Sequence, residues 1–165
     1  MERDKRRISR SVVLLAILIA SVGLMLGCSK KEVKLNPDLN VNLLSAVIVG
    51  NSHQVYSLLD QGADPNSRDS YGYTALMDSV LANQPDITQA LIDKGADVNA
   101  QKDGGETALL AAMRLTGRDD IAKILIEHGA DVNVKDSQGH SLLWKAEQGG
   151  RTEIANLLRQ HGATP

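Results

Sequence analysis

The sequence Gly95-Ala96-Asp97-Val98-Asn99 decides the fold, because close copies of it recur along the chain at a nearly constant interval. Gly62 begins GADPN, Gly129 begins a second GADVN, and Gly162 begins a shortened GAT. These glycines are separated by 33, 34 and 33 residues. A constant period of this size predicts stacked repeats, each too small to bury its own apolar face without its neighbours.

A second landmark keeps the same interval. Thr-Ala-Leu occurs at residues 74–76 and again at 107–109, and Ser-Leu-Leu at 141–143 is its degenerate third copy. We therefore predict an all-α solenoid of four helix-turn-helix units with boundaries at the glycines: Val41–Gln61, Gly62–Lys94, Gly95–His128 and Gly129–Pro165. The third unit has one extra residue, which we place around Leu115–Gly117, in the turn between its two helices.

The second unit shows the expected order of elements within one period. Thr74 can cap a first helix that extends to Ala82, and Pro85 suits the first turn of a second helix. Gly95 follows the last apolar residue at helical spacing and can take the left-handed conformation that ends a helix. The stretch from Asn99 to Gly105 is predicted to be a turn.

Residues 41–165 resemble ankyrin repeats. The resemblance rests on two sets of residues that match the turn and helix start of that family: Asp69, Gly72, Thr74 and Leu76, and then Asp136, Gly139 and Leu143. It implies a protein-binding module that uses its hairpin tips and inner helices.

The chain departs from the pattern of the family at each helix start, and we expect weaker hydrogen bonding there. Apolar residues replace the usual Pro and His, and Lys102 replaces the hairpin Asp of the middle turn. The replaced positions are Ala75, Ala108 and Leu142 for Pro, and Met77, Leu110 and Trp144 for His.

The ends of the array are predicted to be polar caps of a complete domain. Leu59, Ile92 and Ile126 stand three residues before a repeat glycine and can pack on the next unit, whereas Arg159 has that place in the last unit. The first unit lacks the turn signature and has a more hydrophilic first helix. Solenoids need polar outer faces at both ends.

Residues 1–27 are predicted to be a signal peptide. Five basic residues lie within the first ten, and an uncharged, largely apolar run of sixteen residues follows from Val12 to Gly27. That run is shorter than the roughly 20 residues of a spanning helix. An uncleaved membrane anchor with an incidental thiol is the alternative.

Cys28, the single cysteine, directly follows this run and resembles the lipidated cysteine of bacterial lipoproteins. The resemblance implies acyl chains on Cys28, and Ser29 after it favours the outer membrane over the inner one. Residues 28–40 would then be a flexible tether, so that the array works close to its membrane in the periplasm.

The charge balance argues against nucleic acid as a partner. The chain has 18 basic and 20 acidic residues, and removal of residues 1–27 leaves 13 basic and 18 acidic residues, a net charge of −5. A binder of phosphate backbones needs a clustered positive surface, which no repeat supplies. A basic or mixed protein surface is the expected partner, and the free protein is expected to be a monomer.

Motifs for catalysis, cofactor binding or metal binding are absent from the sequence, so we predict no enzyme activity, no cofactor and no metal. His128 and His161 precede repeat glycines and should end helices, while His53 and His140 have no carboxylate at a fixed spacing. Asp64, Asp97 and Asp131 repeat with the fold and are interpreted as turn formers.

Aromatic residues at hairpin-tip or inner-helix positions predict the binding surface, because Tyr and Trp dominate interface energetics. Structural roles remain the alternative: Trp144 could fill space in the last repeat, and Tyr71 and Tyr73 could cover their turn. Neighbouring polar positions extend the patch, with Asp78 and Lys145 at the same place in their repeats. The predicted partner-binding residues are Arg68, Ser70, Tyr71, Tyr73, Asp78, Asp103, Glu106, Arg114, Gln138, His140, Trp144 and Lys145.

These features together predict a membrane-tethered periplasmic module that holds one specific protein. Small exported lipoproteins with such repeats resemble immunity proteins that neutralise effectors, such as lipases, injected by competing bacteria. The alternative is an accessory of a resident periplasmic enzyme or envelope complex, for example in oxidative-stress defence.

Overall fold

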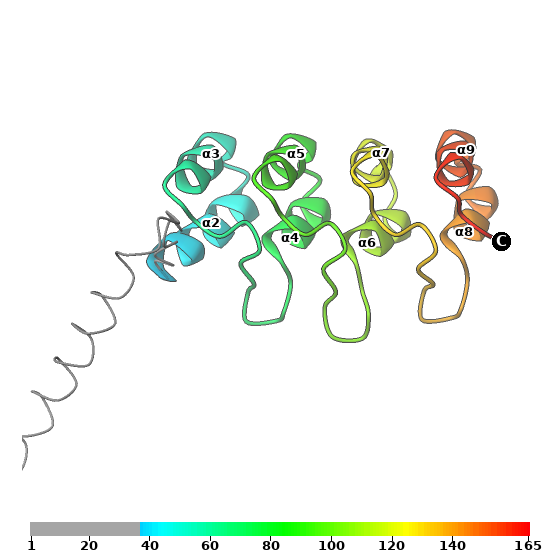
Figure 1. The fold of residues 1–165 in the computed structure, drawn as a ribbon, viewed down its shortest axis with the longest axis horizontal. Helices are drawn as coiled ribbons and strands as arrows, with labels where there is room; N and C mark the ends of the chain where they lie inside the picture. Colours follow the sequence, from blue (N-terminus) through cyan, green and yellow to red (C-terminus); the bar gives the residue numbers. More distant parts are fainter. Residues whose placement is uncertain (1–36) are drawn as a thin grey trace, which may run out of the picture. The chain divides into compact units, whose positions relative to one another are not determined.

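The computed structural model describes residues 37–165, so the predicted signal peptide, Cys28 and most of the predicted tether lie outside the described residues. Within residues 37–165 the chain forms eight helices in four consecutive pairs (Figure 1). The helices are α2 (Pro37–Val49), α3 (Ser52–Asp60), α4 (Ala75–Leu81), α5 (Pro85–Asp93), α6 (Ala108–Arg114), α7 (Asp119–Glu127), α8 (Leu142–Gln148) and α9 (Thr152–Gln160).

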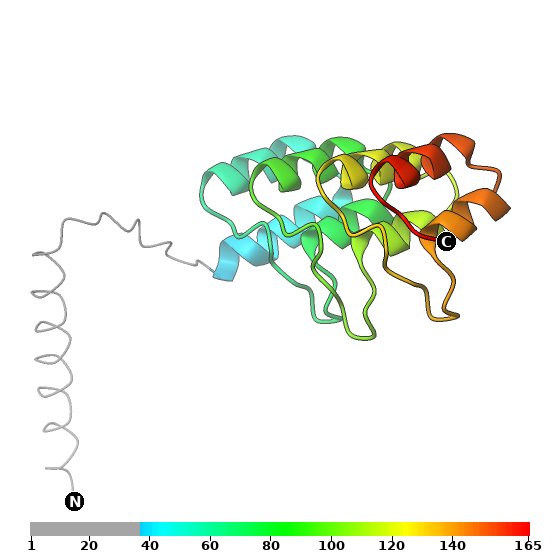
Figure 2. The ribbon, with the colours of Figure 1, turned by 45° about the vertical axis from the view of Figure 1, so that its right-hand side comes forward.

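The pairs stack in a row of two layers. The inner helices α2, α4, α6 and α8 pack side by side, and so do the outer helices α3, α5, α7 and α9. Figure 2 shows the three long loops between successive pairs projecting together on the side of the inner helices. This arrangement confirms the predicted all-α solenoid of four units.

The predicted start of the first unit is wrong. α2 begins at Pro37 rather than at Val41, so residues 37–40, which were expected to be unstructured tether, are helical. Asn40 is part of this extra turn, and its side-chain Oδ1 accepts a hydrogen bond from the backbone N–H of Asp64 at 2.8 Å. The additional turn therefore ties the first repeat to the loop that follows it.

The local signals at the helix ends are confirmed. The hydroxyl groups of Thr74, Thr107 and Ser141 each accept the backbone N–H three residues on, at 3.1 to 3.2 Å. The capping bond is thus made in all three repeats despite the missing Pro and His. Pro85 is the first residue of α5, and Gly95 follows that helix with φ of +91°.

Equivalent apolar residues of successive repeats form one continuous core. Leu76, Leu109 and Leu143 of the inner helices are buried, and the residues at two positions of the outer helices are fully buried. Those outer-helix residues are Ile87, Ile121 and Ile154, and Leu91, Leu125 and Leu158. Because burial repeats with the sequence period, all the pairs share one register.

A ladder of asparagine side chains links each repeat to the next. Asp97 accepts the N–H of Asn99 at 2.9 Å, which confirms its predicted role as a turn former. The Asn66 side chain then accepts the N–H of Asp97 at 2.7 Å and donates to the carbonyl of Gly95 at 3.2 Å. The same bonds recur at Asn99 and Asn133, and each net bond is worth about 1 kcal/mol.

The extra residue of the third unit lies where it was predicted. Residues 115–118 separate α6 from α7, whereas residues 82–84 separate α4 from α5. Arg118 in this turn donates from Nε to the carbonyl of Val80 and from Nη2 to that of Leu81, both at 3.1 Å. A guanidinium at the carbonyl end of a helix also opposes the negative end of the helix dipole, so Arg118 stabilises the end of α4.

The last repeat presents a polar end. Arg159 is exposed and bonds to Glu147, whereas Leu59 and Ile126 at the equivalent positions are buried. His128 and His161 directly follow α7 and α9, as predicted. Across the described 129 residues, none of the helices has the length and apolar character needed to cross a membrane.

Candidate protein-interaction surface

The three long loops of the array are hairpin-like, and a carboxylate shapes two of them. Asp69 Oδ1 accepts the N–H groups of Tyr71 and Tyr73, each at 2.8 Å. Asp136 Oδ1 accepts those of Gln138 and His140, each at 2.9 Å. Isolated antiparallel bridges close these loops between residues 68 and 74 and between residues 135 and 141.

The middle loop replaces this carboxylate by Lys102, which makes a different contact. Its Nζ lies 4.0 Å from the centroid of the Tyr73 ring in the preceding loop, a cation–π distance. Arg68 also joins these two loops, because its Nη1 donates to the carbonyls of Gly72 and Gln101 at 2.9 and 3.1 Å. Two of the predicted binding residues, Arg68 and Tyr73, therefore hold neighbouring loops together.

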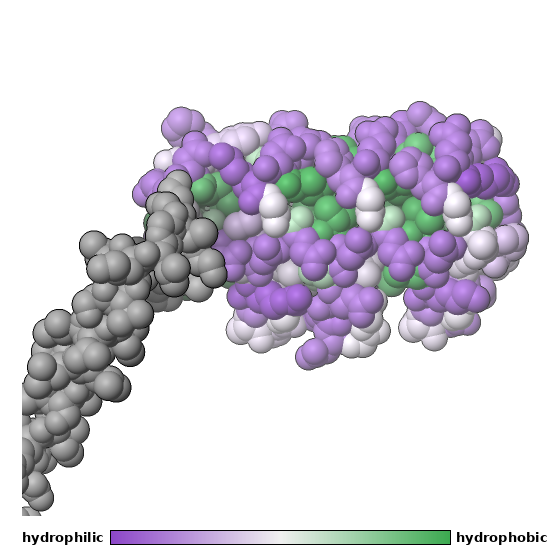
Figure 3. Space-filling model, viewed as in Figure 1, coloured by the Kyte–Doolittle hydropathy of each residue, from purple (hydrophilic) through white to green (hydrophobic). Residues whose placement is uncertain are grey.

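The tips of the loops carry the most accessible of the predicted residues. Ser70, Asp103 and Gln138 are exposed, and Tyr71 is 76% exposed. Tyr73, by contrast, is half-buried against the core. Figure 3 shows that hydrophilic residues predominate at the loop edge of the visible face, and that an interrupted hydrophobic band runs along the row above them.

Trp144 is part of an exposed aromatic pair. It is 42% exposed and stacks on the ring of His140, with centroids 4.0 Å apart and planes inclined by 11°. Trp144 therefore does not fill the interior of the last repeat. His140 also corrects an expectation, since its Nδ1 lies 3.4 Å from Oδ2 of Asp136, a carboxylate four residues earlier.

The inner helices carry opposite charges at equivalent positions. Lys145 Nζ bonds to Asp136 Oδ2 at 2.9 Å, and this bond, followed by the amide of His140, holds the pKa of Asp136 well below its usual range. Within residues 37–165, Asp78 has no such partner. Burial and then the nearby carboxylate of Asp69 raise the pKa of Asp78 to about 6, and its Oδ2 is buried without a hydrogen-bond partner among the described residues.

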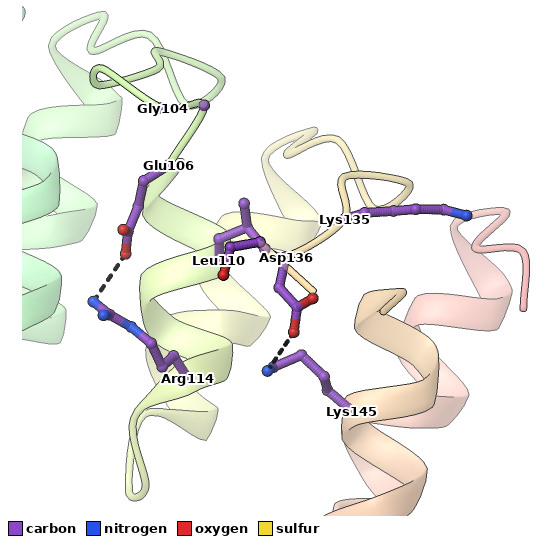
Figure 4. Close-up of a pocket in the computed structure, with 9 residues that line it drawn as sticks. Gly104, Glu106, Leu110, Arg114, Lys135, Asp136 and Lys145 are labelled. Carbon is purple, nitrogen blue, oxygen red and sulfur yellow. Dashed lines mark hydrogen bonds and ion pairs between the residues drawn. The ribbon is translucent and has the colours of Figure 1, made fainter. Parts of the chain in front are cut away.

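A hollow of about 130 Å³ lies between the third and fourth repeats. Two ion pairs lie on its opposite sides, Glu106 with Arg114 and Asp136 with Lys145 (Figure 4). The nitrogen and oxygen atoms of each pair are 2.9 Å apart. Leu110 lies between the pairs. The hollow therefore brings three predicted residues together, but their charges neutralise each other.

Sequence reasoning missed the other residues around this hollow. Lys135 stands at the same place in its repeat as Arg68, which was predicted, and Figure 4 shows its ammonium pointing away from the Asp136–Lys145 pair. The remaining lining residues are Gly104, Gly105, Leu110, Asp136 and Ser137. The equivalence with Arg68 was the one signal that could have added Lys135.

The potential metal-ligating side chains of the described region are dispersed. In residues 37–165, His, Cys, Asp and Glu side chains do not gather in threes at a spacing that would hold a metal ion. The hollow described above is open and its ionic groups are engaged with one another. What this surface offers is a row of loop tips and inner helices whose side chains differ from repeat to repeat.

Such a row defines a helical-repeat binding module. Ankyrin repeats (3 copies) match this chain at residues 20–102, 43–136 and 100–165, so the chain belongs to the ankyrin-repeat family. Members of this family are typically binding modules without enzymatic activity, and their repeats mediate protein–protein interaction, which implies a protein partner. A search of curated proteins found no match to the chain.

Proposed function

We propose that this protein is an exported, membrane-tethered module that holds one specific protein on its inner helices and loop tips. The observation that supports it most is a contrast within the repeats. Residues that build the fold recur at every period, whereas the fourth residue after each helix cap is Asp78, Ala111 or Lys145. Asp78 and Lys145 are half-buried and Ala111 is buried, so the charge of this row changes sign between the second and fourth repeats, as suits a partner of complementary charge.

The membrane tether and the periplasmic location are the second step of the proposal. They rest on the basic residues and the apolar run before Cys28 and on the resemblance of Cys28 to a lipidated cysteine. Two or more acyl chains hold a protein stably at a bilayer, whereas one chain does not. Globomycin treatment, which blocks the signal peptidase of lipoproteins, should cause the uncleaved precursor to accumulate; an unchanged mass would contradict the tether.

Within this proposal the module is an immunity protein that blocks a toxic effector delivered by competing bacteria. A blocker held at the membrane lies where a membrane-attacking lipase acts. Loss of the gene should lower survival only when a toxin-delivering competitor is present. Unchanged survival in that competition would contradict this role, and a growth defect in pure culture would favour an accessory of a resident envelope partner.

The contact surface can be tested by capture from detergent-solubilised envelope fractions. The double variant Tyr71→Ala with Trp144→Ala removes the two exposed aromatic side chains of the loop and inner-helix row. Tyr56→Ala is the matched control, because Tyr56 is also exposed but lies on the outer helix α3. The double variant should lose the captured protein and the control should retain it. Equal recovery by all three proteins would contradict the placement of the surface.

A further inference from the structure

The first helix of the array was predicted to be more hydrophilic, but α2 presents an apolar strip that the other inner helices lack. Val41, Ile48 and Val49 are 62%, 62% and 80% exposed. At about 100° per residue, these three residues and the exposed Ser45 fall within an arc of roughly 100° on the helix. We call these four residues the α2 strip.

Equivalent positions in the other repeats show why the strip is unusual. Val41 corresponds to Thr74, Thr107 and Ser141, which are buried cap residues. Ile48 corresponds to Leu81, which is half-buried, and in the last repeat to Gln148, which is polar. The α2 strip is therefore an exposed apolar helix face. Within the described residues, Val41 stays exposed, whereas the cap residues at the same place in the later repeats are buried.

The strip lies beside an uncompensated carboxylate. α2 packs along α4, and because Leu43 and Leu76 are buried at equivalent positions, the two helices share one register. That register places Ser45 beside Asp78 and Ile48 beside Leu81. The helices on either side of Asp78 carry Ser45 and Ala111 at its level, so neither supplies a cation, and Asp69 adds a second negative charge.

In the fourth repeat, the loop carboxylate binds a cation that stands at the position of Asp78. Asp136, the equivalent of Asp69, binds the ammonium of Lys145, which has the position of Asp78 in its own repeat. In the second repeat the corresponding ammonium is missing, and Asp78 Oδ2 is left buried without a hydrogen-bond partner in the described region. A buried carboxylate without a partner favours a cation supplied from outside.

We propose that the α2 strip and Asp78 together form the docking site for a protein segment that carries aliphatic side chains next to a Lys or Arg. The aliphatic side chains cover Val41, Ile48 and Val49, and the cation reaches the carboxylate of Asp78. This inference rests on the proposed function, since it names the chemistry of the partner on the same inner-helix row. The hollow between the third and fourth repeats is a weaker candidate because its charges are already paired.

A random peptide library displayed on phage, selected on the full-length protein in detergent, tests this proposal. Enriched peptides should carry a Lys or Arg beside aliphatic residues. Ile48→Ser and Asp78→Asn should each weaken the selected peptides about tenfold or more. Tyr56→Ser and Asp86→Asn are matched controls, because both residues are exposed and lie on outer helices, and they should change affinity less than about twofold.

The pH dependence of peptide affinity distinguishes a direct contact with the Asp78 carboxylate from a purely structural effect of the substitution. Affinity for the wild-type protein should fall as the pH is lowered from about 7.5 to 5, because Asp78 becomes protonated, and the Asp78→Asn protein should not show this fall. The wild-type and variant proteins are compared on the same peptide, so titration of the peptide itself cancels.

Several outcomes would overturn the inference. Enriched peptides that lack a basic residue, or that bind Ile48→Ser and Asp78→Asn as well as wild type, would overturn it while leaving a protein-binding role in place. A dimer in sedimentation that Ile48→Ser abolishes would assign the strip to a second copy. Binding to phosphatidylethanolamine–phosphatidylglycerol vesicles that Ile48→Ser abolishes would assign it to the membrane. Failure to enrich any peptide would count against both this inference and the proposed function.

Discussion

The second and fourth repeats share one scaffold and differ in one electrostatic detail. Both cap the inner helix with a hydroxyl, and both use a carboxylate to accept two amides of the preceding loop. Four residues after the cap, however, the second repeat has Asp78 and the fourth has Lys145. The same site therefore holds a repelled, half-buried carboxyl in one repeat and a closed ion pair in the other.

This difference separates the residues that build the fold from those free to serve a partner. Changing Asp to Lys at the fourth position leaves the helix, its cap and its packing in place. The leucines and glycines of the period are not free in this way, because their burial or backbone conformation is the same in every copy. Substitutions at both kinds of position test this distinction.

The largest effect is expected from the shared core. Leu91→Ala should lower the free energy of unfolding by about 2 to 5 kcal/mol, because a fully buried side chain leaves a cavity. Urea unfolding followed by circular dichroism measures this loss. Leu158→Ala at the equivalent position of the fourth repeat should destabilise in the same way, and a change within experimental error in both variants would contradict the shared register.

A smaller loss is expected at the repeat glycine. Gly95→Ala should cost about 1 to 2 kcal/mol, because φ is +91° and an L-residue is strained in this conformation. A Cβ added at Gly95 would meet no other atom within 4 Å, so backbone strain is the whole cause. The same urea experiment measures it. An alanine as stable as glycine would mean that the turn does not need the left-handed conformation.

Asp78→Lys should make the second repeat resemble the fourth. It removes the repulsion with Asp69 and supplies an ammonium, so we expect a gain on the order of 1 kcal/mol at pH 7, after allowing for solvent screening. Asp78→Asn, which removes only the repulsion, should gain less, and Lys145→Asp should lower the melting temperature. A less stable Asp78→Lys protein would show that the two sites are not equivalent.

The pH dependence of stability should have opposite signs at the two sites. Asp78 has a raised pKa in the folded state. Its stabilising contribution to folding is therefore complete below the pKa of the unfolded chain, about 4, and is lost as the pH rises through about 6. Asp136 has a lowered pKa, so its contribution is present above about pH 4 and is lost as the pH falls. Wild type should lose stability relative to Asp78→Asn between pH 4 and 6, and parallel curves would contradict this.

The smallest effect on stability is expected at the loop tip. Tyr71→Ala should change the free energy of unfolding by less than about 0.5 kcal/mol, because most of the side chain is in solvent. Thermal unfolding of the purified protein checks this. A loss above 1 kcal/mol would show that Tyr71 supports its loop, as Tyr73 does, rather than standing free for a partner.

The fold could be predicted from the sequence because its signals are local. Thr74, Pro85 and Gly95 each mark an element boundary by their own chemistry, and the period then repeats the assignment. The helix start at Pro37 had a similar signal, since Asn36, Pro37 and Asp38 are the residues favoured at a cap and in the first turn. The asparagine ladder was also visible in principle, because Asn66, Asn99 and Asn133 recur as regularly as the aspartates.

The candidate surface was harder to predict because its contacts join residues about one period apart. Lys102 meets Tyr73 across neighbouring loops, and the exposed strip of α2 is recognisable only by comparison with covered positions in later repeats. His140 and Asp136 are only four residues apart in the sequence. In a loop, however, that spacing predicts a contact only when the loop conformation is known. Stacking therefore creates the surface, and the sequence alone shows the period of that stacking.

The most direct test of the account is a carbon-detected NMR titration of the aspartate carboxyl groups in the wild-type protein. One scaffold with opposite charges at its fourth position predicts that Asp78 titrates near pH 6, while Asp136 stays ionised well below the usual range of an aspartate. If both carboxyl groups titrate near pH 4, the two repeats do not hold their carboxylates in the environments described, and the comparison on which the docking site rests is wrong.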